Sequence, residues 1–204
     1  MEIILLRHGE TDWNFQGRCQ GVSDPDLNET GIRQAEEIAE RLQLEKIDAI
    51  YSSASKRSLR TAEAICQLHG LGVTVDDEFR ELDHGEFEGL TFTEIRATYP
   101  DFIRKWRDEP VELLLPGGER LIDVDTRVWA GINRIIKRHR PGETVVIVSH
   151  NFPILAILCR ITKTSFNQYR TFHLDPCGLS RVVYNQGAGW GIVQINNRSY
   201  NHPA

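Results

Sequence analysis

The sequence predicts an α/β protein built on an open, mostly parallel sheet, and three observations support this prediction. Short apolar runs rich in β-branched residues, typical of buried strands, alternate with longer segments whose apolar residues recur at helical spacing. Polar, glycine-containing segments follow the apolar runs directly, as loops do at strand ends. The 204 residues are 40% hydrophobic and 26% charged, as in globular proteins, with no repeat, low-complexity tract or linker. We therefore expect a single domain over residues 1–204.

The first half of the chain alternates strands and helices. Residues 2–6 (EIILL) form an apolar run that predicts a buried strand. From Thr30, a candidate N-cap, apolar residues recur at helical spacing as far as Leu42 and predict a helix. The remaining elements expected here are a strand at 47–51, a helix capped by Ser53 or Ser55 that ends near His69 before Gly70, and a strand at 73–75.

The second half contains longer helical segments and the run with the highest share of β-branched residues. Residues 91–106 follow a helical pattern that Pro100 interrupts, which predicts one broken helix or two. The run at 144–148 (TVVIV) predicts a strand covered on both faces. The other expected elements are an amphipathic helix from Leu121 to Ile136 that Pro141 and Gly142 terminate, a helix at 152–161, and a closing hairpin of strands at 179–184 and 191–195.

Composition excludes several classes of protein. A net charge of −5 argues against a nucleic-acid-binding or anionic-membrane surface, while it permits a local cationic pocket. Residues 1–6 are too short for a secretory signal, and no apolar run reaches the roughly 18 to 20 residues that cross a bilayer. The four cysteines are scattered without a C-x-x-C pair, so we expect reduced thiols and a cytoplasmic protein.

Histidines and arginines follow the predicted strands. Arg7 and His8 come directly after the first strand, and His150 follows Ser149 at the end of the strand at 144–148. Because ligands bind beyond the carboxyl ends of strands in open α/β sheets, we expect both histidines to converge there. Arg57 lies near the start of a predicted helix, where backbone N–H groups also favour an anion. Each of these residues alone is better explained as a surface charge or a structural histidine, but together they predict a phosphate or carboxylate site.

Six segments, in order, resemble the histidine phosphatase superfamily, also called the phosphoglycerate mutase-like family. They cover most of the chain: LLRHGETDWN from Leu5, LNETG from Leu27, SSASKRSLRTAE from Ser52, RELDHGEFEG from Arg80, PGGE from Pro116 and VIVSHN from Val146. The resemblance implies a three-layer α/β/α sandwich with a central mostly parallel (mixed) sheet. It also implies a phosphatase that needs no cofactor and acts on a small phosphorylated metabolite.

The resemblance also assigns roles to residues. His8 matches the family's nucleophile, a neutral imidazole that takes the phosphoryl group and for which the Gly9 backbone is the expected partner of the other ring nitrogen. Arg7, Arg57 and His150 match the phosphate clamp, which stabilises the charge on the transferring group. Asn14 and the backbone N–H of Asn151 are candidates for further phosphate contacts.

The segment that begins at Arg80 supplies a carboxylate for the general acid that the expected reaction needs. Glu81 matches the family's general acid, which protonates the leaving alkoxide and then deprotonates the attacking water. In an extended segment Asp83 points to the same face, so it stays a rival or a partner in this role. Candidate substrate-binding residues are Gln20, Gly21 and His84. No metal-ligand spacing is present, so we expect no metal.

Two other functions remain open at this point. A cofactor-dependent phosphoglycerate mutase is one, although its family members carry a long insertion that excludes water, whereas the interval from Gly89 to Gly118 is short here. A catalytically silent phosphate-binding protein is the other. Similar enzymes are often dimers, so a homodimer is also an open expectation.

The sequence leaves the substrate undecided. Related phosphatases act on phosphoserine, 3-phosphoglycerate, alpha-ribazole phosphate or a broad range of esters. Phe92, Phe102 and Trp106 are better explained as helix core than as an apolar lid. Arg120 stands where relatives commonly have a small hydroxyl residue, which puts the start of the following helix in doubt and places a cation near the expected pocket rim.

Overall fold

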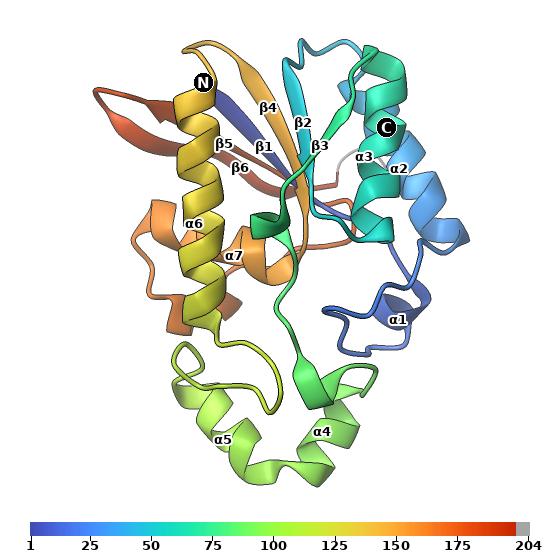
Figure 1. Ribbon diagram of the computed structural model, residues 1–204, viewed down its shortest axis with the longest axis vertical. Coiled ribbons are helices and arrows are strands. Elements are labelled where there is room, and N and C mark those ends of the chain that lie inside the picture. The colour runs from blue at the N-terminus through green and yellow to red at the C-terminus, as the bar shows by residue number, and fades with distance from the viewer. Residues whose placement is uncertain (199–204) are drawn as a thin grey trace.

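Residues 1–198 of the computed structural model are described here, and they form one six-stranded mixed sheet with helices on both faces (Figure 1). The strand order is β3-β2-β4-β1-β5-β6. The first four strands in this order are parallel, and β5 and β6 form an antiparallel hairpin at one edge. Their bounds are β1 Glu2–Arg7, β2 Ala49–Ser52, β3 Val73–Val75, β4 Thr144–Ser149, β5 Leu179–Asn185 and β6 Gly189–Asn197.

The two central strands are buried on both faces, as their β-branched composition predicts. Successive side chains point to opposite faces, so Ile3 and Val145 belong to a different apolar cluster from Ile4 and Val146. The first cluster packs against α6 (Leu121–Arg138) and α7 (Asn151–Thr162), and the second packs against α2 (Glu29–Leu42) and α3 (Lys56–His69). The expected three-layer α/β/α sandwich is therefore confirmed.

The helix starts differ in detail from the sequence prediction. Thr30 is not the N-cap of α2, because the helix begins at Glu29 and the side chain of Asn28 accepts a hydrogen bond of 2.8 Å from the backbone N–H of Gly31. Asn28 lies one residue before the helix and can therefore reach an unpaired N–H of the first turn, whereas Thr30 is already helical. Ser55 is the N-cap residue of α3, but its side chain makes no capping hydrogen bond.

Residues 91–106 form two helices, so Pro100 separates them. α4 is Phe92–Thr98, and α5 is Pro100–Asp108 with the proline in its first turn, where the missing N–H costs nothing. α6 begins directly after Arg120, whose backbone N–H donates to the carboxylate of Asp123 at 3.2 Å. The sequence prediction missed four short elements: α1 Asp12–Phe15 and the 3₁₀ turns η1 Asp77–Phe79, η2 Gly85–Phe87 and η3 Phe166–Thr171.

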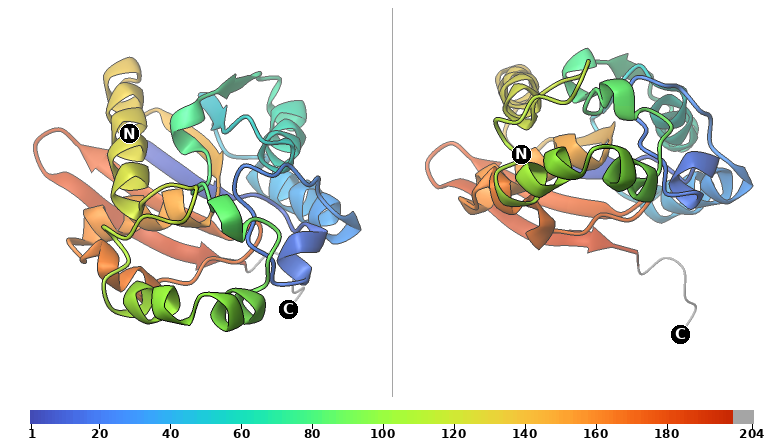
Figure 2. Two further views of the ribbon diagram at one scale, coloured as in Figure 1. Left: turned by 60° about the horizontal axis from the view of Figure 1, so that its bottom comes forward. Right: turned by 90° about the horizontal axis from the view of Figure 1, so that it is seen from below.

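The carboxyl ends of β1, β2 and β4 meet at one end of the sheet. Figures 1 and 2 show α4 and α5 lying across this end of the molecule, beyond the strands. None of the helices in residues 1–198 is long and apolar enough to cross a membrane.

Candidate active site

The register of the two central strands brings the two strand-end histidines together. β1 and β4 are parallel neighbours that pair Arg7 with Ser149, so the next residues, His8 and His150, emerge side by side. Their ring centroids lie 5.0 Å apart in an edge-to-face arrangement. The backbone N–H of His8 also donates to the carbonyl of Ser149 at 3.0 Å. The expected convergence of the histidines is confirmed.

His8 is held in the tautomer that a nucleophile needs. Its Nδ1 lies 2.7 Å from the carbonyl oxygen of Gly9, so Nδ1 carries the proton and Nε2 keeps its lone pair. The backbone N–H of Gly9 donates to Thr61 Oγ1 at 3.1 Å, which fixes the turn. A Cβ at position 9 would lie 2.6 Å from the carbonyl oxygen of Gly31, so this close approach requires glycine. Burial, together with the charges of Arg57 and Arg7, lowers the pKa of His8 well below 6.5 and keeps the imidazole neutral.

Two arginines, one buried and one partly buried, supply positive charge beside His8. Arg57 is fully buried and donates to the carbonyl oxygens of Gly21 at 3.0 Å and Ser23 at 2.9 Å. It therefore positions the loop at 21–23 as well as contributing charge. Arg7 donates from Nη1 to the carbonyl of Leu174 at 2.6 Å, while its buried Nε has no hydrogen-bond partner among the described residues. This unpaired N–H can serve a bound anion.

His150 is a neutral hydrogen-bonding residue in this structure. Arg57 Nε donates to its Nδ1 at 3.4 Å, so the ring proton lies on Nε2, which is 2.8 Å from Ser53 Oγ. The hydroxyls of Ser58 and Ser55 lie 3.2 and 3.4 Å from the same nitrogen. Burial and the neighbouring charges lower the pKa of His150 well below 6.5, so the permanent positive charge of this cluster comes from Arg7 and Arg57. A phosphate dianion bound beside His150 would raise the pKa of His150 again.

Glu81 is a buried carboxyl group at the start of α7. Its Oε2 accepts from the backbone N–H of Asn151 at 3.0 Å, and its Oε1 accepts from Phe152 at 3.1 Å and Leu82 at 2.8 Å. Burial raises the pKa of Glu81, and this effect outweighs the opposing hydrogen bonds and arginine charges. A carboxyl group that holds its proton to higher pH is suited to act as a general acid.

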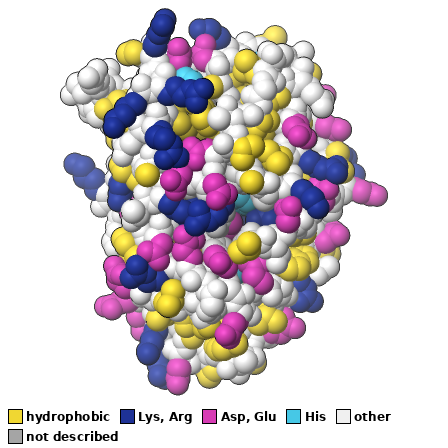
Figure 3. Space-filling view, in the orientation of Figure 1, with side chains coloured by type: hydrophobic (Ala, Val, Ile, Leu, Met, Phe, Trp, Pro, Cys, Tyr) yellow, Lys and Arg dark blue, Asp and Glu magenta, His cyan; other side chains and the backbone are white. Residues whose placement is uncertain are grey.

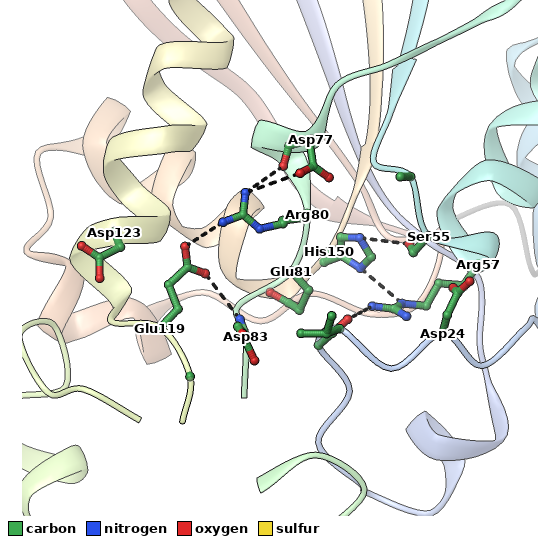
Figure 4. A pocket seen from close by; sticks show the side chains of 14 residues that line it. Asp24, Ser55, Arg57, Asp77, Arg80, Glu81, Asp83, Glu119, Asp123 and His150 are labelled. Carbon is green, nitrogen blue, oxygen red and sulfur yellow. Dashed lines mark hydrogen bonds and ion pairs between the residues drawn. The ribbon is translucent and has the colours of Figure 1, made fainter. Parts of the chain in front are cut away.

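A cavity of about 640 Å³ opens over these groups, and Arg57, Glu81 and His150 line it (Figure 4). His8 is only 2% exposed and lies outside the cavity lining, beside His150. Carboxylates dominate the outer part of the cavity, as Figure 3 shows by the acidic side chains around the middle of this face. The outer charged residues are Asp24, Asp77, Arg80, Asp83, Glu119 and Asp123.

The remaining candidate residues have different places around the cavity. Gly21 lines it, and a Cβ there would lie 2.2 Å from the carbonyl oxygen of Leu82. Gln20 is buried and accepts from Thr11 Oγ1 at 2.6 Å. Asn14 Oδ1 accepts from the backbone N–H of Thr11 at 3.2 Å, which leaves its amide N–H groups as donors. Gln20 and Asn14 are outside the cavity lining, so their contact with a substrate stays a prediction.

His84 and Asn151 are both engaged within the protein. The His84 ring lies 6.0 Å from the ring of Phe152, and burial lowers its pKa to about 4. The backbone N–H of Asn151 points at Glu81 because the free N–H groups at the start of α7 attract the nearest carboxylate. Its contact with a phosphate would compete with that bond. Asp83 lines the cavity and its Oδ1 accepts from the backbone N–H of Gly85 at 2.9 Å, whereas Glu81 is hydrogen-bonded to Asn151, the residue after His150.

Arg120 is not the cation at the pocket rim. Its guanidinium forms two hydrogen bonds with Asp123, at 2.8 and 2.9 Å, and it is absent from the cavity lining. Arg80 lines the cavity instead and lies 3.3 Å from Glu119. The sequence favoured the helix core for three aromatic residues, and this holds for two of them. Phe102 and Trp106 stack at 5.8 Å in the apolar cluster, whereas Phe92 is 56% exposed.

Sequence reasoning missed two positioning residues. Arg127, 8% exposed, projects from α6 and donates to the carbonyls of Glu78, Arg80 and Glu81, so it holds the acid-bearing segment. The sequence feature that could have identified Arg127 is its position on the apolar side of the predicted helix that begins at Leu121. Glu88 accepts hydrogen bonds from the backbone N–H groups of Val22 at 3.0 Å and Ser23 at 3.2 Å. It therefore holds the same loop, residues 21–23, to which Arg57 donates.

All four cysteines are free thiols, as expected. Burial raises the pKa of Cys19 and of Cys159 to about 11, which makes these two thiols unreactive near neutral pH. Within residues 1–198, no group of three or more His, Cys, Asp or Glu side chains is arranged to hold a metal ion.

Comparison with known proteins agrees with this geometry. The family model of the histidine phosphatase superfamily (branch 1) matches residues 3–198, so the chain belongs to that superfamily. Phosphoserine phosphatase 1 of Hydrogenobacter thermophilus is 38% identical over 196 residues, covering 96% of this chain and 92% of that protein.

Solved structures share the whole fold. Bacillus stearothermophilus YhfR superposes with a TM-score of 0.91 at 30% identity, covering 98% of both chains. A phosphoserine phosphatase from Entamoeba histolytica, solved in complex with 3-phosphoglyceric acid, superposes with a TM-score of 0.85 at 27% identity and the same coverage of both chains. The chain therefore has the phosphoglycerate mutase-like fold that its motifs indicated.

Proposed function

We propose that this chain is a phosphatase that hydrolyses small phosphomonoesters through a phosphohistidine on His8. The observation that carries the proposal is the buried His8 ring, whose Nδ1 is held by the Gly9 carbonyl and whose lowered pKa keeps Nε2 unprotonated. Membership of a phosphatase superfamily and the similarity to named phosphoserine phosphatases support the same reaction.

In the first half-reaction, Nε2 of His8 attacks phosphorus while the bond from phosphorus to the ester oxygen breaks. Glu81 gives its proton to that oxygen, and the alcohol leaves. Arg7 and Arg57 face the negative charge that spreads over the phosphoryl oxygens and stabilise it. In the second half-reaction, the Glu81 carboxylate takes a proton from water, the water oxygen attacks phosphorus, and the bond to His8 breaks to release phosphate.

The outer cavity favours a substrate whose alcohol part carries a positive charge. Asp24 and Asp83 form no ion pair among residues 1–198, and the charge of Arg80 is shared between Asp77 and Glu119. An ammonium group would therefore find carboxylates without ion-pair partners beyond the phosphoryl group. Phosphoserine carries such an ammonium group, and Arg80 in the same part of the cavity is a cation for its carboxylate. We propose phosphoserine as the preferred substrate class, ahead of 3-phosphoglycerate, alpha-ribazole phosphate or a broad range of esters.

One set of assays tests this function. Wild-type protein should release phosphate from a generic aryl phosphate and from phosphoserine, and His8→Ala should abolish both activities. With 3-phosphoglycerate and its bisphosphorylated primer, primer-dependent isomerisation would instead indicate a mutase, and no reaction with any substrate would indicate a phosphate-binding protein. Either result would refute the proposal.

A charge-neutralising variant tests the substrate class separately. Asp83→Asn should lower kcat/KM for phosphoserine about tenfold, the effect of losing one charged contact, while leaving kcat/KM for the aryl phosphate nearly unchanged. The matched control is Glu36→Gln, on the exposed face of α2, which should change neither. Equal losses on both substrates in Asp83→Asn would contradict recognition of the ammonium group.

Three further properties belong to this proposal. We propose that catalysis needs no metal, since the steps above use only side chains; full activity after dialysis against a chelator would support this. We propose a cytoplasmic location, which the four free cysteines support, and a single domain over residues 1–204, which the shared six-stranded sheet supports. That the chain forms a homodimer stays a prediction, and analytical ultracentrifugation would test it.

A further inference from the structure

A second cavity, of about 540 Å³, lies between α4, α5 and η3. Its lining includes Arg96, Arg104, Arg107, Arg170, Phe92 and Trp106, and we call it the α5 groove. None of its lining residues also lines the cavity over His8 and Glu81. The α5 groove is therefore separate from the candidate active site.

The α5 groove is positively charged in a protein whose net charge is −5. Four arginines line it, against a single acidic residue, Asp101. Arg104 pairs with Asp101 at 2.9 Å and Arg107 with Asp108 at 3.1 Å, and all four of these side chains are well exposed. Exposed ion pairs of this kind neutralise little of the arginine charge. Arg96 has no ion pair or side-chain hydrogen bond among residues 1–198. The groove thus keeps a cationic field opposite in sign to the outer catalytic cavity.

Aromatic side chains give the groove a rigid wall. The indole N–H of Trp106 donates to the hydroxyl of Tyr169 at 3.1 Å, and the guanidinium of Arg170 lies over the Tyr169 ring at 4.7 Å. One face of Trp106 stacks on Phe102. These contacts fix Arg170 and Trp106 before any ligand arrives, while Phe92 exposes 56% of its surface beside them.

We propose that the α5 groove binds a small, multiply charged anion that carries a flat ring, the chemistry of a nucleoside polyphosphate. Guanidinium groups recognise phosphate oxygens with paired N–H donors, and arginines from two helices and η3 require more than one anionic group to be satisfied together. An exposed phenyl ring beside guanidinium groups suits a planar base. The cavity volume lies within the range of roughly 300 to 1,000 Å³ typical of small-molecule sites.

Calorimetric titration with ATP in the presence of a chelator tests the proposal. The protein is saturated with tungstate, a tetrahedral oxyanion that fills the phosphoryl site at His8 and prevents turnover. ATP should bind the tungstate-saturated wild type, and added salt should weaken binding because the contacts are ionic. No binding, or binding only when tungstate is left out, would overturn the proposal, since the second outcome places ATP at His8.

Two double variants locate the site. Arg96→Ala/Arg104→Ala should weaken ATP binding at least tenfold, because each removes a charged donor. Arg33→Ala/Arg140→Ala, which removes two exposed arginines elsewhere, should leave binding unchanged. Both variants should unfold at the wild-type temperature, because the substituted side chains are exposed. Equal affinity of the two double variants would overturn the assignment to the α5 groove.

Comparison of ATP with inorganic triphosphate tests the ring. ATP should bind more tightly than triphosphate to the wild type, and Phe92→Ala should remove that advantage. Equal binding of the two ligands to the wild type would overturn recognition of a planar group. Phosphatase turnover without ATP tests the catalytic proposal independently of these results.

Discussion

Arg127→Met should destabilise the protein strongly and disturb the acid-bearing segment at 78–81. Arg127 and Glu119 form two hydrogen bonds, at 2.9 and 3.1 Å, and their side chains are 8% and 12% exposed. Arg127 also donates to three backbone carbonyls in this segment. Methionine keeps much of the aliphatic volume but leaves the three carbonyl acceptors without their donor. Among residues 1–198, the Glu119 carboxylate then keeps only the half-exposed Arg80, at 3.3 Å, as an ionic partner.

The magnitude follows from the loss of one partner of a buried pair. Breaking such a pair costs about 3 to 5 kcal/mol in the free energy of unfolding, and for a chain of this length that lowers the melting temperature by roughly 6 to 20 °C. Urea denaturation and thermal melting measure both quantities. The matched control is Arg134→Met on the same helix. The Arg134 side chain is 53% exposed, and its ion pair with Asp76 should contribute no more than about 1 kcal/mol.

A double variant separates the buried charge from packing. In Arg127→Met/Glu119→Gln the buried carboxylate that lost its main partner is gone, so part of the lost stability should return. Equal destabilisation by Arg127→Met and Arg134→Met would refute the reasoning, as would strictly additive effects in the double variant.

Three further outcomes are expected. Glu81→Gln should lower kcat for an alkyl phosphomonoester by roughly a hundredfold to ten-thousandfold, and less for an aryl phosphate whose leaving group needs no proton; equal losses on both substrates would contradict the acid role. The free energy of unfolding should decrease as the pH falls below 6.5, because His8 and His150 bind protons in the unfolded chain but stay neutral in the folded protein. Urea titrations on both sides of pH 6.5 measure how steeply this free energy changes with pH. The same pH dependence in His8→Ala would count against this explanation. Gly21→Ala would place a Cβ 2.2 Å from the carbonyl of Leu82 and displace the loop that Arg57 holds, so it should lower kcat/KM about tenfold to a hundredfold. In the control Gly72→Ala the new Cβ meets nothing within 4 Å, so kcat/KM should not change. Similar kinetics in the two variants would exclude a catalytic effect of this loop.

The fold was largely predictable because its central strands carry a strong local signal. The apolar run at 144–148 is long, β-branched and bounded by polar residues, so its burial on both faces follows from composition alone. The cap of α2 was less predictable, because both Asn28 and Thr30 are residue types that cap helices and only the backbone conformation decides between them. The 3₁₀ turns carry no periodic pattern that sequence reasoning can use.

The centre of the candidate site was predictable, while its supporting contacts were not. His8 and His150 follow strands that the sequence marks clearly, and the parallel register then determines their proximity. Arg127 and Glu88 act on backbone atoms of segments tens of residues away, and such contacts leave no trace in local spacing. The cation at the cavity rim was misassigned for the same reason, because only tertiary contacts show that Asp123 engages Arg120.

Rapid-quench labelling during turnover tests the central proposal most directly. Wild-type protein mixed with a radiolabelled phosphomonoester should accumulate phosphate in an acid-labile bond, and peptide mapping should locate that bond on His8. His8→Ala should carry no label. Steady turnover without an acid-labile phosphoenzyme, or label on any other residue, would contradict the covalent mechanism and the role given to this imidazole.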